Sequence, residues 1–135
     1  MGRSILAIVV GFVVIGVLSL GTDAVTTTLM PQLYTNGRME SVTWLLVTQV
    51  YVFLYATFGC WLTGRLAPDR PMRHAIILGL LGLAFNLAGS AMQWATVPVW
   101  YHVLAIALVM PASYLGGLLA ERRGGVTIPP RAAAI

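Results

Sequence analysis

Four long apolar stretches separated by short polar links constrain the fold of this chain more than any other feature. They cover residues 5–30, 42–66, 75–95 and 99–120. Each stretch can cross a lipid bilayer, which takes about 20 residues of α-helix. Only 9% of the residues are charged, whereas soluble globular proteins carry about 25%. The chain is therefore predicted to be an all-α integral membrane protein with four transmembrane helices.

The links between the stretches predict how the helices are arranged. Helices joined by short links pack as antiparallel neighbours, so we expect an up-down-up-down bundle. Asn36-Gly37 in the first link is a turn signal. The bundle is expected to form one transmembrane domain over residues 1–123. Residues 124–135 are expected to form a loosely ordered tail in the cytoplasm.

The placement of arginine predicts the orientation in the membrane. All arginines except Arg38 fall at the N-terminus, in or next to the second link, or at the C-terminal end. Since cytoplasmic segments are enriched in arginine and lysine, both termini are predicted to be cytoplasmic in a bacterial-type inner membrane. The predicted cytoplasmic anchors are Arg65, Arg70, Arg73, Arg122 and Arg123. Eight arginines against four acidic side chains give the net charge of +4, and no aromatic and basic patch indicates nucleic-acid binding.

Asp23 is the one acidic side chain inside the apolar stretches. Gly16, Ser19 and Asp23 follow helical spacing, so they share a face of the first helix. An aspartate within a membrane span usually faces protein or water rather than lipid. We therefore expect the other three helices to enclose Asp23.

Small residues form stripes on the third and fourth predicted helices. Gly79, Gly82, Asn86, Gly89 and Gln93 recur every three or four residues, and so do Ala112, Gly116 and Ala120. Membrane helices associate where small residues let their backbones approach. The predicted helix-packing residues are Gly16, Ser19, Gly79, Gly82, Gly89, Ala112, Gly116 and Ala120. The stripe on the third helix could alternatively line a substrate path.

Polar side chains gather at one depth, in the half of the bundle near the first and third links. The predicted site residues are Asp23, Thr48, Tyr51, Tyr55, Asn86, Gln93 and His102. This layer could lock the helices together by mutual hydrogen bonds, or form an outward-facing pocket for a ligand, ion or proton. A third possibility is a metal or cofactor site on Asp23 and His102. Because two ligands are too few to specify a metal, neither a metal nor a cofactor is predicted.

The sequence lacks the motifs of catalysis and nucleotide binding. It contains no nucleophile elbow, no HExxH, no P-loop and no dinucleotide fingerprint. We expect a non-enzymatic protein that acts by helix–helix contact. It would be an accessory or structural subunit of a larger membrane complex, such as a respiratory or photosynthetic assembly, or a homo-oligomer. Its partners would be the lipid bilayer and other membrane subunits or itself.

The alternative function is a small transporter or an ion- or proton-conducting protein that uses Asp23 and an outward-facing polar pocket. Four spans in a short chain, with one acid in the first, resemble the small multidrug resistance transporters. The resemblance covers topology only. It implies a dimeric transporter in which Asp23 takes the place of an essential glutamate. That glutamate lies near mid-membrane in the family, whereas Asp23 lies nearer the end of its span.

Overall fold

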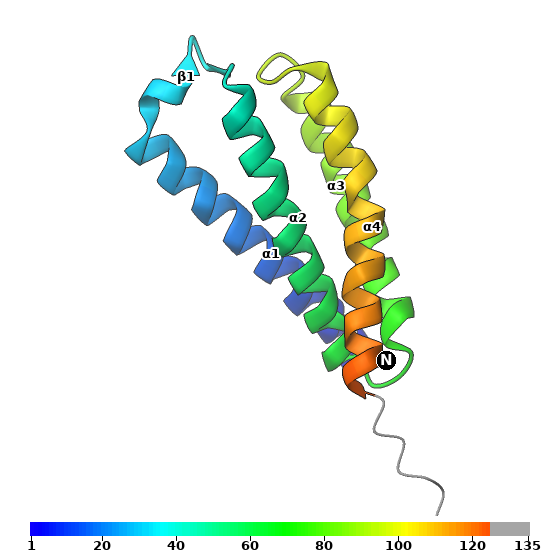
Figure 1. The fold of residues 1–135 in the computed structure, drawn as a ribbon. Helices are drawn as coiled ribbons and strands as arrows, with labels where there is room; N and C mark the ends of the chain where they lie inside the picture. The colour runs from blue at the N-terminus through cyan, green and yellow to red at the C-terminus, as the bar shows by residue number, and fades with distance from the viewer. Residues whose placement is uncertain (125–135) are drawn as a thin grey trace, which may run out of the picture.

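The computed structural model describes residues 1–124 as four long helices with a small hairpin between the first two. The helices are α1 (Gly2–Leu29), α2 (Val42–Leu66), α3 (Pro71–Met92) and α4 (Val99–Gly124) (Figure 1). All four are long and apolar enough to cross a membrane, which confirms the predicted class of multi-pass helical membrane protein. Residues 125–135, nearly all of the predicted tail, lie outside the described residues.

The helix bounds differ most from the prediction at α3. This helix begins at Pro71 rather than at residue 75, and it ends at Met92. Proline suits the first position of a helix, because the backbone N–H that it lacks would have no partner there. Arg70, just before it, adopts a left-handed conformation with φ 47° and ψ 67°. The short polar turn between α2 and α3 is therefore tighter than predicted.

The first link folds into a short 3₁₀ helix and a two-stranded hairpin. The 3₁₀ helix η1 covers Pro31–Leu33, and the strands β1 (Tyr34–Thr35) and β2 (Arg38–Met39) pair antiparallel. Asn36 and Gly37 join the strands with φ values of 50° and 76°. Two successive positive φ values are typical of the tightest hairpin turns, for which Asn-Gly is the preferred pair. The turn signal in the sequence is thus found at a hairpin turn.

The first and third links are joined by a backbone hydrogen bond. The N–H of Met39 donates to the carbonyl oxygen of Thr96 at 3.2 Å. The side chain of Met39 is buried, with 8% of its surface exposed. The hairpin is therefore fastened to the link between α3 and α4.

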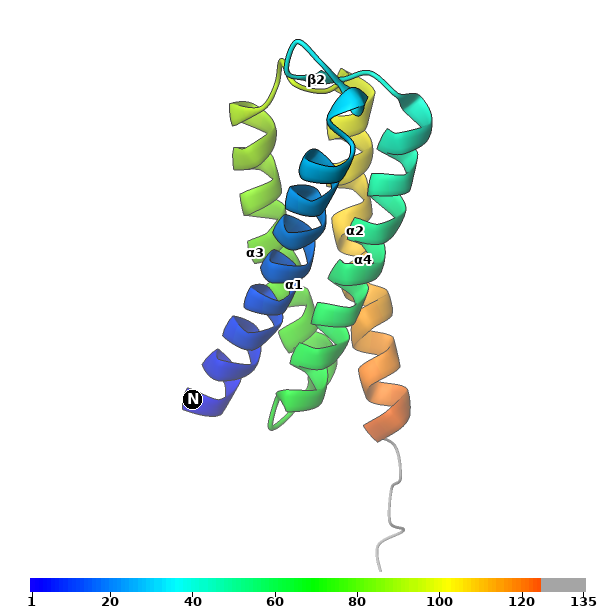
Figure 2. The same ribbon diagram turned by 90° about the vertical axis from the view of Figure 1, so that its left-hand side faces the viewer.

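The helix α1 runs obliquely across the other three helices, as the two views in Figures 1 and 2 show. The start of α1 and the turn between α2 and α3 lie at one end of the molecule, which we call the arginine end. The hairpin and the link between α3 and α4 lie at the other end, which we call the hairpin end. Figure 1 shows α1 diverging from α2 toward the hairpin end.

The helices α2 and α4 are in close contact at Gly116, in the half of the bundle near the arginine end. A Cβ atom placed on Gly116 would lie 2.6 Å from both the Cβ of Cys60 and the carbonyl oxygen of Thr57. A residue larger than glycine would therefore push the two backbones apart. Ala112 and Ala120 lie one turn to either side, and each is only 1% exposed. The small residues of α4 thus lie at a close helix crossing.

The helix α1 crosses α2 at Gly11. A Cβ on Gly11 would lie 2.8 Å from the carbonyl oxygen of Gly59. The hydroxyl of Thr63, which is fully buried, donates to the carbonyl oxygen of Ala7 at 3.1 Å. Close approach and an interhelical hydrogen bond are the two means by which membrane helices associate. The start of α1 is therefore fixed to the end of α2.

The expected packing at Gly16 and Gly89 is not what the structure shows. A Cβ on either residue would meet no atom within 4 Å, and one on Gly82 would only touch Val109 at 4.0 Å. Ser19 is half-buried. These residues fall where the helices have begun to separate, so no backbone is close enough to need a glycine. In contrast, a Cβ on Gly79 would lie 2.6 Å from that of Ser113.

Candidate functional site

A polar cavity of about 420 Å³ lies at the hairpin end, where α1 diverges from the other helices. All four helices contribute to its lining. The predicted site residues that line it are Asp23, Thr48, Tyr51, Asn86, Gln93 and His102. Gly89, predicted as a packing residue, also lines it. The polar stripe on α3 therefore runs from a packed contact at Gly79 into an open cavity.

Tyr55 is the predicted site residue that does not line the cavity. Its hydroxyl lies 3.0 Å from the hydroxyl of Thr22, and either group could donate. Its ring packs on that of Tyr51, with 5.5 Å between the ring centroids. Tyr55 therefore joins α2 to α1 next to the cavity.

Asp23 reaches the cavity from α1 and has one partner on another helix. The hydroxyl of Tyr51 donates to its Oδ1 atom at 2.7 Å. The carboxylate is otherwise exposed rather than enclosed by three helices, which corrects the expectation from the sequence. Thr48 does not reach it, because its hydroxyl donates to the carbonyl oxygen of Trp44 in its own helix at 3.0 Å. The divergence of α1 explains why only a long tyrosine side chain spans the gap.

Three polar atoms around this cavity are buried but have no hydrogen-bond partner. In the part of the chain that the structure describes, they are Nε1 of Trp44, Oδ1 of Asn86 and Nε2 of His102. All three residues line the same cavity. A buried polar atom without a partner costs about 1–3 kcal/mol, so proteins usually supply one from their own groups, from water or from a ligand. The cavity thus presents unused hydrogen-bonding capacity.

His102 is held by aromatic contacts rather than by hydrogen bonds. Its ring is stacked on that of Trp94, with centroids 5.1 Å apart and planes 5° apart. The ring of Tyr101 meets it edge-on at 6.2 Å. Only 4% of His102 is exposed. These contacts fix the plane of the imidazole, whose Nε2 atom has no hydrogen-bond partner among the described residues.

Several residues that line the cavity are absent from the set predicted from the sequence, and Gln49 and Trp44 are two of them. Gln49 is 5% exposed, and its amide donates to the carbonyl oxygen of Tyr101 at 3.2 Å. An amide inside an apolar stretch needs a partner in lipid, and this is the signal that could have identified Gln49. Nothing in the sequence indicates that Trp44 would line a cavity and that its Nε1 would lack a partner, since tryptophan at a span end also suits a membrane interface.

The described residues offer few ligands for a metal. Within residues 1–124, no group of three or more His, Cys, Asp or Glu side chains could hold a metal ion. Asp23 and His102 both line the cavity, but they are the only two such side chains among its described lining residues. The arrangement therefore suits hydrogen bonding and charge pairing.

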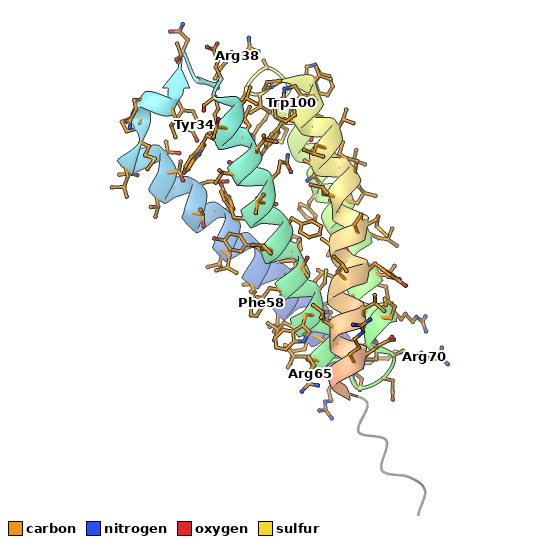
Figure 3. The ribbon with its side chains drawn as sticks, viewed as in Figure 1. Tyr34, Arg38, Phe58, Arg65, Arg70 and Trp100 are labelled. Carbon is orange, nitrogen blue, oxygen red and sulfur yellow. The ribbon has the colours of Figure 1, made fainter. Side chains whose placement is uncertain are left out.

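The predicted anchors lie away from the cavity. Arg65 and Arg70 lie at the arginine end, whereas Arg38, Tyr34 and Trp100 lie at the hairpin end (Figure 3). Arg73 and Arg122 are exposed. Arg123 is within α4, but its side chain lies outside the described residues.

Comparison of the chain with protein-family models, with curated proteins and with solved structures finds no match in any of the three.

Proposed function

We propose that this protein is a small transporter or ion-conducting membrane protein that binds its solute in the cavity at the hairpin end. One observation carries the proposal: each helix contributes to the lining of one cavity a residue that has either a carboxylate or a polar atom without a hydrogen-bond partner. These groups are the carboxylate of Asp23 and the unpartnered atoms of Trp44, Asn86 and His102. Polar groups that served only to lock helices together would be expected to bind one another.

The charge of the cavity favours a proton, a small cation or a neutral solute over an anion. Asp23 supplies a carboxylate, and no arginine or lysine among residues 1–124 lines the cavity. Carboxylates within membrane proteins commonly mark ion and proton pathways. The hydroxyl of Tyr51, which donates to Asp23, would keep the carboxylate oriented toward the solute.

The proposed orientation makes the cavity face outward. We infer an up-down-up-down bundle with both termini in the cytoplasm of a bacterial-type inner membrane. The arginines gathered near the α2–α3 turn and the end of α4 support this orientation, because cytoplasmic segments are enriched in arginine. In this orientation the hairpin end and the cavity face the non-cytoplasmic side. The protein has no proposed enzymatic activity.

Flux measurements on reconstituted protein test the proposal. The full chain would be placed in liposomes of phosphatidylethanolamine and phosphatidylglycerol that contain a pH-sensitive dye. Proton flux would be driven by a potassium gradient with valinomycin, and sodium flux would be followed with a sodium dye. We expect flux of at least one of these ions, and at least tenfold less with Asp23→Asn. Glu40→Gln is the matched control, because Glu40 is an exposed acid that does not line the cavity. Flux no faster than in empty liposomes would refute ion conduction, and equal flux in all three proteins would refute the role of Asp23.

A second function, an accessory subunit or a homo-oligomer that acts by contact, is favoured by the exposure of Asp23. A charge at this depth is unfavourable against lipid, and a neighbouring subunit or a second copy could cover it. Gentle purification from native membranes distinguishes the two. A contact protein would co-purify with a defined partner or as a stable oligomer, whereas a monodisperse monomer would argue against this function.

A further inference from the structure

A second concavity lies at the arginine end, between the start of α1 and the start of α3. Its volume is about 850 Å³. The helix α1 contributes Ile5 and Ile8, and the α3 side contributes Arg70, Arg73 and Ile77. It arises because the oblique α1 separates from α3 toward this end, as Figure 2 shows. Among the described residues, none lines both this concavity and the cavity at the hairpin end.

The lining of this concavity is divided between charge and apolar surface along the helix axis. Arg70 and Arg73 are exposed near the first turn of α3, at the edge of the membrane-length segment. Ile77 lies one turn deeper on the same helix as Arg73, and 39% of it is exposed. Across the gap, 63% of Ile5 is exposed. The site thus has a cationic outer part and an apolar inner part.

The backbone positions the two arginines at the outer part. The carbonyl oxygen of Arg70 accepts hydrogen bonds from the N–H of Arg73 at 3.0 Å and, at 3.2 Å, pairs with Nδ1 of His74. Asp69 also lines the concavity and offsets part of the charge. The two guanidinium groups still outnumber its carboxylate, and the positive end of the α3 dipole adds to them. The outer part therefore favours an anion.

We propose that this concavity binds an anionic phospholipid, with its phosphate on Arg70 and Arg73 and an acyl chain along Ile5, Ile8 and Ile77. The occupant follows from the lining: a negatively charged head and an apolar tail are needed together at the membrane edge. Basic pockets between transmembrane helices bind anionic headgroups in this way. Guanidinium groups suit phosphate because they can donate two parallel hydrogen bonds to it.

Native mass spectrometry of the full chain in mild detergent tests this proposal. Phosphatidylglycerol and phosphatidylcholine with identical acyl chains would be added to the protein. We expect phosphatidylglycerol to bind at least several-fold more tightly than phosphatidylcholine. Arg70→Gln with Arg73→Gln should weaken that binding roughly 30-fold, since each surface cation contributes about a factor of five. Equal binding of the two lipids to the unaltered protein would overturn the proposal without any variant.

Control variants separate the site from general surface charge. Arg65→Gln with Arg122→Gln removes two exposed arginines that do not line the concavity, and it should leave binding unchanged. Arg73→Gln alone, which leaves the left-handed Arg70 intact, should weaken binding roughly fivefold and guards against misfolding of the double variant. Equal losses in the control would overturn the proposal. So would displacement of phosphatidylglycerol by equimolar inorganic phosphate, which would indicate a phosphate site that makes no use of the isoleucines.

Discussion

The two halves of this bundle are built on different principles. Near the arginine end, α2 and α4 meet at Gly116 and α1 meets α2 at Gly11, at distances that admit no side chain. Near the hairpin end, a Cβ on Gly16 or Gly89 would touch nothing within 4 Å, and a cavity of about 420 Å³ separates the helices. The first half is held by backbone approach, and the second is bridged by a few long polar side chains.

This contrast explains how a small membrane protein can keep an open polar site. In lipid there is no hydrophobic driving force for helices to associate, so close packing and hydrogen bonds between helices must stabilise the bundle. Packing concentrated in one half leaves the other half free to present polar groups. We therefore expect substitutions in the two halves to have opposite signatures, with stability changing in one and binding in the other.

The largest expected effect is at the α2–α4 crossing. Gly116→Ala would place a Cβ 2.6 Å from the Thr57 carbonyl oxygen and 2.8 Å from the Trp61 nitrogen. Both are backbone atoms, so they cannot move unless the helix α2 moves. We expect a loss of about 1–3 kcal/mol in unfolding free energy, as for other overpacked sites. Denaturant unfolding in detergent micelles, followed by tryptophan fluorescence, measures it. Gly16→Ala is the control and should change stability little; similar losses in both would erase the contrast between the halves.

The second-largest effect on stability is expected from replacing a threonine with valine, and the two halves should differ in its size. Thr63→Val removes a buried hydroxyl that bonds to α1, at the carbonyl oxygen of Ala7. Thr48→Val removes one that bonds only within its own helix, to Trp44. We expect Thr63→Val to cost about 1 kcal/mol and Thr48→Val clearly less, because only the first breaks a contact between helices. Denaturant unfolding in detergent micelles measures both changes in stability. A larger cost at Thr48 would show that the hairpin end is the better packed half.

A smaller effect of opposite sign is expected inside the cavity. Oδ1 of Asn86 is buried without a partner, so Asn86→Leu removes an unsatisfied group. We expect stability to stay within about 1 kcal/mol of the unaltered protein, or to rise. Ion flux in liposomes should fall in the same variant. A strong loss of stability would mean that Asn86 already has a partner that the structure does not show.

The smallest effect on stability is expected at the hydrogen bond between the hydroxyl of Tyr51 and the carboxylate of Asp23. Tyr51→Phe removes it, and we expect a cost of about 0.6 kcal/mol, the average for such bonds in membranes. Amide hydrogen exchange should detect the loss of this bond more clearly than global unfolding does. Exchange of residues 20–29 should become faster, while that of residues 5–15 stays the same. Asp23→Asn is the matched control, since an amide oxygen can still accept from Tyr51. Unchanged exchange over residues 20–29 in Tyr51→Phe would show that α1 needs no tether there.

Much of this arrangement could be read from the sequence, because hydropathy and turn chemistry are local. The span limits and the Asn36-Gly37 turn are examples. The depth of Asp23, Thr48 and His102, counted from the helix ends, also placed them at one level, and the structure brings them to one cavity. Such properties depend on position along a helix and not on how helices cross.

What the sequence could not supply is the path of α1 across the bundle. This helix is apolar on nearly every face, since lipid and protein neighbours both accept apolar side chains. Its pattern therefore does not show whether Gly11 or Gly16 meets α2. For the same reason Asp23 was expected to be enclosed, whereas it is exposed apart from its bond to Tyr51. The crossing angle is a property of the whole bundle.

The backbone bond between Met39 and Thr96 limits how this molecule can move. The helix α1 packs tightly against α2 at Gly11, near its beginning. Its other end leads into the hairpin, which is bonded to the link between α3 and α4. A helix attached at both points can bend between them, but it cannot rotate away from the bundle as a rigid body. Any change in the volume of the cavity must then come from bending of residues 15–29, while the hairpin stays attached to the link between α3 and α4.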